Sequence, residues 1–202
     1  MSEKRKPAGM GRPRNAALDT AITAAVEQLL LADGYGAVTI DRVAALAGTT
    51  RTALYRRFPG RVALIASALA AHFGTDPAPD TGNLRDDLTE LQRRQVEFFQ
   101  NPVVAAGIAG LLGDLSSDPE WSALFHEGFM APRRRSTEAM FQRAVDRGEI
   151  PPVTHPTVVS DTLTGPLLLH VMLPATGPLD DTLVAATVDS ALHLLSAGVR
   201  DA

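Results

Sequence analysis

The stretch from Thr39 to Arg61 reads TIDRVAALAGTTRTALYRRFPGR, and it predicts two short helices joined by a tight turn. Thr39 and Thr50 each stand where a helix N-cap hydroxyl is needed. Gly48 ends the first helix, and a Pro-Gly pair follows the second. A helix, a turn and a second helix rich in arginine, hydroxyl and tyrosine side chains are typical of a helix-turn-helix that sets one helix into a DNA major groove.

The second helix carries side chains suited to that contact. Arg51 has the reach for a bidentate pair with a guanine edge, and Thr50 and Thr52 are suited to a phosphate or a thymine methyl. Tyr55 lies one turn further on, where its hydroxyl would reach a backbone phosphate. Arg61 would add its charge to the positive end of the next helix and bind a phosphate there.

The charge of the chain is divided between its two ends. The net charge is −4, yet residues 1–61 hold ten Lys or Arg against five Asp or Glu, while residues 62–202 hold nine against eighteen. A basic N-terminal part is the electrostatic signature of phosphate binding. The alternative is a solvated basic tail with no partner.

The rest of the sequence predicts an all-α fold. Alanine and leucine dominate, aromatic residues make up only 5%, and apolar positions recur at helical spacing. We expect a flexible basic arm over 1–15, a three-helix DNA-binding domain with its connecting helix over 16–74, and a helical bundle over 83–202, for which the resemblance described below implies ligand sensing and dimerisation. The loop Thr75–Gly82 separates the two domains. The predicted helices cover 16–33, 39–47, 50–57, 61–73, 84–99, segments starting at 102 and 119, 132–147, 156–173 and 180–198.

From Gly11 to Leu64 the chain resembles the tetracycline-repressor (TetR) family of bacterial transcription regulators. The resemblance rests on Gly11–Arg14, Gly34–Gly36, Thr39-Ile40, Val43-Ala44, Ala47-Gly48, Leu54–Phe58, Arg61 and Leu64. It implies that Thr39 and Tyr55 bind phosphates, that Arg51 and Thr52 lie in the groove, and that the arm reaches the adjacent minor groove. The full set of expected DNA-binding residues is Arg12, Arg14, Thr39, Thr49, Thr50, Arg51, Thr52, Tyr55, Arg56 and Arg61.

Two positions depart from the family pattern. Lysine is common in the family where Arg61 stands, and that change keeps the charge. A valine-serine pair is common where Thr49 and Thr50 stand, so Thr50 preserves the cap while Thr49 replaces a packing residue. The second departure bears on base preference.

The C-terminal part is expected to supply a two-fold interface, because one recognition helix gives too few contacts for tight specific binding. The segments 156–173 and 180–198 are apolar on more than one face, so each must bury two faces. One face would pack in its own domain and the other against a second copy in a homodimer. The alternative is an ordinary buried helix.

The resemblance also implies a small-molecule site in the C-terminal part, without giving its residues. Aromatic and methionine side chains around a few polar atoms suit an apolar effector. The residues expected to line such a site are Phe98, Trp121, Phe125, His126, Phe129, Met130 and His170. Alternatively, the aromatic stripe is plain core and the histidines are structural. For Arg133–Arg135, a solvated face or intersubunit salt bridges are favoured over a second nucleic-acid patch.

Several other functions are disfavoured by the sequence. There is no cysteine, and no two of the five histidines share helical metal-ligand spacing, so we expect no metal and no cofactor. Glycine-rich phosphate loops and nucleophile elbows are missing, so no catalytic residue is assigned. No signal peptide or membrane span is recognised, which favours the cytoplasm. We therefore expect a repressor that a small molecule releases from a palindromic operator; the alternative is a helical DNA-binding or architectural protein without such a switch.

Overall fold

The computed structural model describes residues 16–72 and 78–197, and this part of the chain contains helices and no strand. The all-α prediction is thus confirmed. The predicted arm, with Arg12 and Arg14, lies outside the described residues. The α-helices are Ala16–Asp33 (α1), Ile40–Leu46 (α2), Arg51–Tyr55 (α3), Arg61–Ala71 (α4), Leu84–Gln100 (α5), Pro102–Ser117 (α6), Pro119–Phe125 (α7), Ala131–Asp146 (α8), Pro156–Met172 (α9) and Asp181–Ala197 (α10).

The helix boundaries follow from the capping residues that the sequence offered. Thr39 and Thr50 accept bonds from the backbone N–H groups of Arg42 and Ala53, at 3.3 Å and 3.2 Å. Asn101 and Asp118 cap α6 and α7 in the same way, each with a proline at the first helical position. The N-caps predicted at Thr39 and Thr50 are therefore confirmed.

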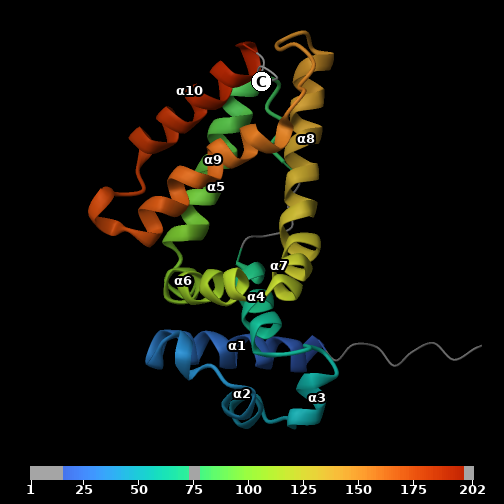
Figure 1. Ribbon diagram of the computed structural model, residues 1–202, viewed down its shortest axis with the longest axis vertical. Coiled ribbons are helices and arrows are strands. Elements are labelled where there is room, and N and C mark those ends of the chain that lie inside the picture. The colour runs from blue at the N-terminus through green and yellow to red at the C-terminus, as the bar shows by residue number, and fades with distance from the viewer. Residues whose placement is uncertain (1–15, 73–77, 198–202) are drawn as a thin grey trace, which may run out of the picture.

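α1, α2 and α3 form a head at one end of the molecule, and the remaining helices form a body at the other (Figure 1). α4 rises out of the head, and α6 lies across the top of α1. The body is a bundle in which α5, α8, α9 and α10 pack on one another. No single helix in the described part is long and apolar enough to cross a membrane; α5 and α6 pass that test only as a pair bent by 85°.

Head and body share one hydrophobic core. Val26 of α1, Leu54 of α3 and Leu64 of α4 belong to the same buried cluster as Val104 and Leu111 of α6. The turn between α7 and α8, His126–Met130, is π-helical. A second cluster, around Met140, fills the far end of the body. The proposed division of the chain into two domains near residues 75–82 stays a prediction.

A polar clamp ties the start of α5 to the end of α8. The carboxylate of Glu149 accepts a hydrogen bond from the backbone N–H of Leu84 at 2.7 Å and another from the guanidinium of Arg147. Arg147 also lies 3.6 Å from the fully buried carboxylate of Asp87. The bond to Arg147 is the largest cause that holds the pKa of Glu149 below its ordinary value, followed by the bond to Leu84.

Glu149→Gln is expected to lower the melting temperature at neutral pH and to leave it nearly unchanged in acid. Because its folded-state pKa is lowered, Glu149 stabilises the fold above about pH 4.3, the ordinary glutamate value. That contribution disappears as the pH falls through the lowered pKa. Thermal unfolding of both proteins between pH 3 and 7 measures the gap. Glu127→Gln, at an exposed carboxylate, is the control, and a gap that stays constant with pH would contradict the assignment.

Candidate DNA-binding surface and ligand cavity

α3 turns its polar side outward. Thr52, Tyr55 and Arg56 are exposed, and 51% of Tyr55 remains accessible. Leu54 is fully buried in the shared core, and Phe58 packs against the same core. The helix is therefore anchored by its apolar face and presents its arginine, hydroxyl and tyrosine groups to solvent, as a recognition helix must.

The two capping threonines stand at the edge of this surface. Thr39 and Thr50 are both exposed, and each hydroxyl oxygen already accepts a backbone N–H. A hydroxyl group has one O–H to donate besides its acceptor lone pairs. Each cap can thus donate to a phosphate without giving up the bond that starts its helix. Thr49, in the preceding turn, is half-buried.

Arg51 is exposed and lies 2.9 Å from the carboxylate of Asp41, with 63% of each side chain accessible. Exposed ion pairs contribute at most about 1 kcal/mol, so this one can open readily.

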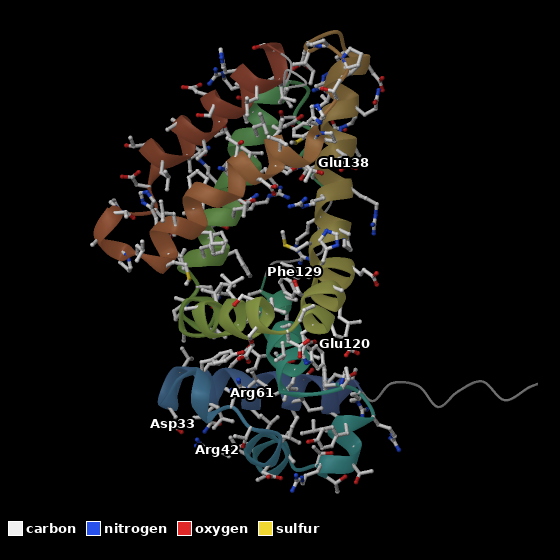
Figure 2. The ribbon with its side chains drawn as sticks, in the orientation of Figure 1. Asp33, Arg42, Arg61, Glu120, Phe129 and Glu138 are labelled. Carbon is white, nitrogen blue, oxygen red and sulfur yellow. The ribbon has the colours of Figure 1, made fainter. Side chains whose placement is uncertain are left out.

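Arg56 forms no ion pair with any described residue. Arg42, which the sequence interpretation overlooked, adds an exposed guanidinium beside Thr39 and lies 2.5 Å from Asp33 (Figure 2).

Arg61 lies between the head and the body (Figure 2). Its guanidinium donates to the carboxylate of Asp114 on α6 at 2.6 Å and to the backbone carbonyl of Tyr35 at 3.4 Å. It also stands 4.7 Å from the centre of the Tyr35 ring. The Tyr35 hydroxyl donates to the same carboxylate at 2.7 Å, and burial is the main cause that raises its pKa. In this conformation Arg61 is engaged with α6, so its predicted phosphate contact stays a prediction.

The body contains an apolar cavity of about 170 Å³, partly open to solvent, between α4, α5, α6, α9 and the junction of α7 with α8. Phe98, Phe125, Phe129 and Met130, all expected from the sequence, line it. Phe129 and Met130 come from the π-helical turn, and such turns are frequent at functional sites. Figure 2 places Phe129 where α7 meets α8.

Three residues expected at the ligand site do not line this cavity. Trp121 packs against Gly60, the residue before α4, and lines a second hollow between α4 and α7. His126 is exposed. The Nδ1 atom of His170 lies 3.1 Å from the carbonyl oxygen of Gly177, so this histidine holds the turn after α9. These residues were selected for their side-chain type, which does not determine which face of a helix turns toward the cavity.

The sequence interpretation also left out polar residues of the cavity wall. Arg133 and Arg134 line the cavity together with Asp161, although a solvated or intersubunit role was expected for them. Arg133 follows Phe129 by one helical turn, and Thr137 follows Arg133 by another. That spacing was the available signal, because it puts a cation on the same face as a cavity-lining ring.

One face of α9 carries exposed apolar side chains. Val158, Leu169 and Met172 keep 40–49% of their surface, and Leu173, directly after the helix, keeps 55%. Val159, Leu163 and Leu167 of the same helix are buried in the body. α9 is therefore apolar on two sides, as the sequence predicted, and only one of them is covered within the chain.

Two protein families match the chain, and together they cover both parts of the fold. Residues 22–68 match the family described as "Bacterial regulatory proteins, tetR family". Residues 78–191 match the family described as "Tetracyclin repressor-like, C-terminal domain". The two matches fall on the head with most of α4 and on the body.

Individual relatives agree with these matches. An HTH-type transcriptional regulator of Mycobacterium tuberculosis is 32% identical over 182 residues, 88% of each chain. The DNA-binding transcriptional repressor TetR of Mycobacteroides abscessus is 32% identical over 190 residues, 92% of this chain and 95% of its own. The crystal structure of the TetR family transcription regulator SCO0332 superposes with a TM-score of 0.69 at 27% identity, over 91% of this chain and 99% of that one. The chain therefore belongs to the TetR family of helix-turn-helix transcriptional regulators.

Proposed function

We propose that the protein is a homodimeric repressor that binds a palindromic operator in the cytoplasm and leaves it when an apolar small molecule fills the body cavity. The observation that carries the proposal is that α6 lines the cavity and also contacts α4, the helix that leads out of the head. Ile108 and Leu111 of α6 line the cavity, and Asp114 of the same helix holds Arg61 at the start of α4. A ligand that shifts α6 therefore acts directly on the helix that leads out of the head.

In the DNA-bound state, α3 would lie in the major groove with Arg51 and Thr52 at base edges. Thr39, Thr50 and Tyr55 would contact phosphates on either side, joined by Arg56. Phosphate contacts fix the position of the protein on the duplex, while base contacts give it sequence preference. The exposure of all six side chains supports this arrangement.

The dimer would form through α9 and α10, the segments expected over 156–173 and 180–198. The uncovered apolar face of α9, at Val158, Leu169 and Met172, supports this interface. Two recognition helices related by a two-fold axis would then meet successive major grooves, about 34–36 Å apart. The operator would repeat its half-site with inverted symmetry.

Release would follow from a difference in affinity between two conformations. An effector that binds the cavity more tightly when α6 is displaced favours a head spacing that no longer fits the operator. By reciprocity, operator DNA must weaken effector binding by the same factor. A ligand with equal affinity for both conformations would release nothing.

Two substitutions in α3 separate phosphate contacts from base contacts. Tyr55→Phe is expected to weaken binding to operator and to random duplex alike, because it removes a phosphate contact. Arg51→Ala is expected to relax base preference by about 1–3 kcal/mol at one position, the cost of a bidentate guanine contact. Gel-shift titration of both duplexes at fixed salt measures the two effects.

Arg85→Ala is the matched control for the Arg51 substitution. Arg85 is similarly exposed and makes a similar surface ion pair, with Asp189 at 2.7 Å, but it lies on α5 in the body. It should bind both duplexes as the unmodified protein does. Unchanged binding by both α3 variants would contradict the assigned surface, and operator binding that no cavity ligand alters would contradict the switch.

A further inference from the structure

Trp121 lies where the body meets the head, at the start of α7. This helix packs beside α4 (Figure 1). The backbone N–H of Trp121 donates to the cap residue Asp118, and its half-buried indole packs against the core that head and body share. The benzo ring of the indole lies against Gly60, in the segment that joins α3 to α4. A side chain of the body therefore contacts the chain just behind the expected recognition helix.

The contact between Trp121 and Gly60 leaves no room for a side chain at position 60. A Cβ atom added to Gly60 would lie 3.1 Å from Cζ2 of Trp121 and 3.7 Å from Cη2, and it would meet no other described residue within 4 Å apart from its chain neighbours. The backbone at Gly60 is extended, with a φ of 173°, a conformation that any residue adopts. What glycine provides here is space for the indole and not backbone freedom.

The recognition helix has few other attachments. α3 is five residues long, its buried residue is Leu54, and it packs mainly on α2. Phe58, after the helix, packs against the shared core, and Arg57 forms an ion pair with Asp19 of α1 at 3.0 Å. The ion pair ties this segment to the head, whereas the contact with Trp121 ties it to the body.

We propose that Trp121 is a positioning residue for DNA recognition, because its indole fixes the turn between α3 and α4 against the body and thereby sets the angle at which α3 enters the major groove. This inference rests on the proposed function, since it takes α3 as the helix that reads the operator. Base contacts from Arg51 and Thr52 depend on hydrogen-bond geometry and therefore on that angle. Phosphate contacts are carried largely by charge and depend on it less.

Two single variants of the full-length protein change the contact from opposite sides. Trp121→Phe keeps an aromatic ring in the core but removes the atoms that reach Gly60. Gly60→Ser adds a Cβ atom against the indole, and it does not weaken the start of α4 because serine is a preferred N-cap residue.

Gel-shift titration measures the binding of each variant to an operator selected from a random duplex library and to unselected duplex. Each single variant is expected to bind the operator about three- to tenfold more weakly, which is less than the loss of a whole bidentate base contact. Binding to unselected duplex should change by less than about twofold, because charge dominates it.

The double variant distinguishes positioning from general loss of stability. A phenyl ring at position 121 leaves room for the added Cβ atom, so Gly60→Ser combined with Trp121→Phe should bind the operator more tightly than either single variant. Leu124→Ala is the matched control, because it trims an exposed side chain of the same helix and the same hollow that does not contact Gly60. It should bind both duplexes as the unmodified protein does.

Fluorescence reports the contact without a label, because the chain contains a single tryptophan. Gly60→Ser should change the emission of Trp121 in the free protein, since a hydroxyl group would then lie next to the indole. Gly113→Ala should leave the emission unchanged, because an added Cβ atom there meets nothing within 4 Å.

The outcomes separate this inference from the proposed function. The positioning role is wrong if Trp121→Phe binds the operator normally, if both duplexes lose affinity equally, if the two losses add up in the double variant, or if Gly60→Ser leaves the emission unchanged. In each of these cases the repressor proposal would stand. If the unmodified protein selected no duplex from the library, the proposed function would fail and this inference with it.

Discussion

Leu169→Glu is expected to give a monomer whose operator affinity is lower by a factor of about 10²–10⁴, the gain that linking two binding units provides. Leu169 is 49% exposed on the uncovered apolar face of α9, near the end of the helix and one turn from Met172. Packing against a second copy would bury this position. A carboxylate there would be desolvated without a partner, which costs several kcal/mol.

Analytical ultracentrifugation across micromolar concentrations measures the assembly, and gel shift on a full operator and on a half-site measures affinity. The monomer should lose affinity for the full operator and little for the half-site. Leu31→Glu places the same charge on an exposed leucine of α1, and it should remain dimeric. If Leu169→Glu forms a dimer of unchanged stability, the dimer interface lies elsewhere on the protein.

Gly110→Ala is expected to separate the head from the body, although alanine normally favours a helix over glycine by about 1 kcal/mol. A Cβ atom at Gly110 would overlap the ring of Tyr35, close to where the ring joins its side chain. The ring cannot swing away cheaply, because its hydroxyl is bound to Asp114 and the Arg61 cation stands over its face. Overpacking of this kind costs about 1–3 kcal/mol.

A control for the Gly110 substitution is available three residues further along α6. Gly113 lies on the same helix, and a Cβ atom there meets nothing within 4 Å. Gly113→Ala should therefore raise the melting temperature, whereas Gly110→Ala should lower it and weaken operator binding. Thermal unfolding and gel shift on both variants compare the two glycines directly.

A double substitution assigns the cause of the Gly110 effect. In a Tyr35→Ala background the ring is gone, so adding Gly110→Ala should become stabilising. The difference between the two backgrounds is the coupling between the residues. If Gly110→Ala destabilises both backgrounds equally, the clash with the Tyr35 ring is not the reason why position 110 of α6 requires glycine.

Much of the fold was predictable because its signals are local. Thr39, Thr50, Asn101 and Asp118 cap helices by bonding to backbone groups two or three residues away, so the sequence alone indicates them. The outward presentation of α3 follows from the buried position of Leu54 within a short helix of otherwise polar or small residues. These features do not depend on which distant segments come together.

The contacts between the head and the body were not predictable in the same way. Arg61 was expected at a phosphate, yet its guanidinium meets Asp114, which is 53 residues away in the chain. Nothing in the sequence around either residue identifies the other. Long-range pairing depends on how α4 and α6 cross, and that crossing is set by packing of the whole core.

The residues that line the cavity were predictable only in part. Phe98, Phe125, Phe129 and Met130 were expected at a ligand site because of their aromatic and methionine side chains, and they line the cavity. Whether a ligand binds there stays a prediction. Side-chain type could not exclude Trp121, because it does not indicate which neighbour a residue faces. Arg133 was set aside since runs of arginine are usually solvated, and its burial becomes visible only once α8 and α9 are in place.

The shared core of head and body also limits how members of such a family can exchange parts. Leu30 of α1 and Leu69 of α4 pack against Gly107 of α6, where an added Cβ would lie 3.1 Å from the nearest Leu69 methyl carbon. A head transplanted onto a foreign body would meet a different α6 surface at these positions. A head and a body from different proteins therefore cannot be combined freely. An exchange of heads requires the residues that contact α6 and those of α6 itself to be exchanged together.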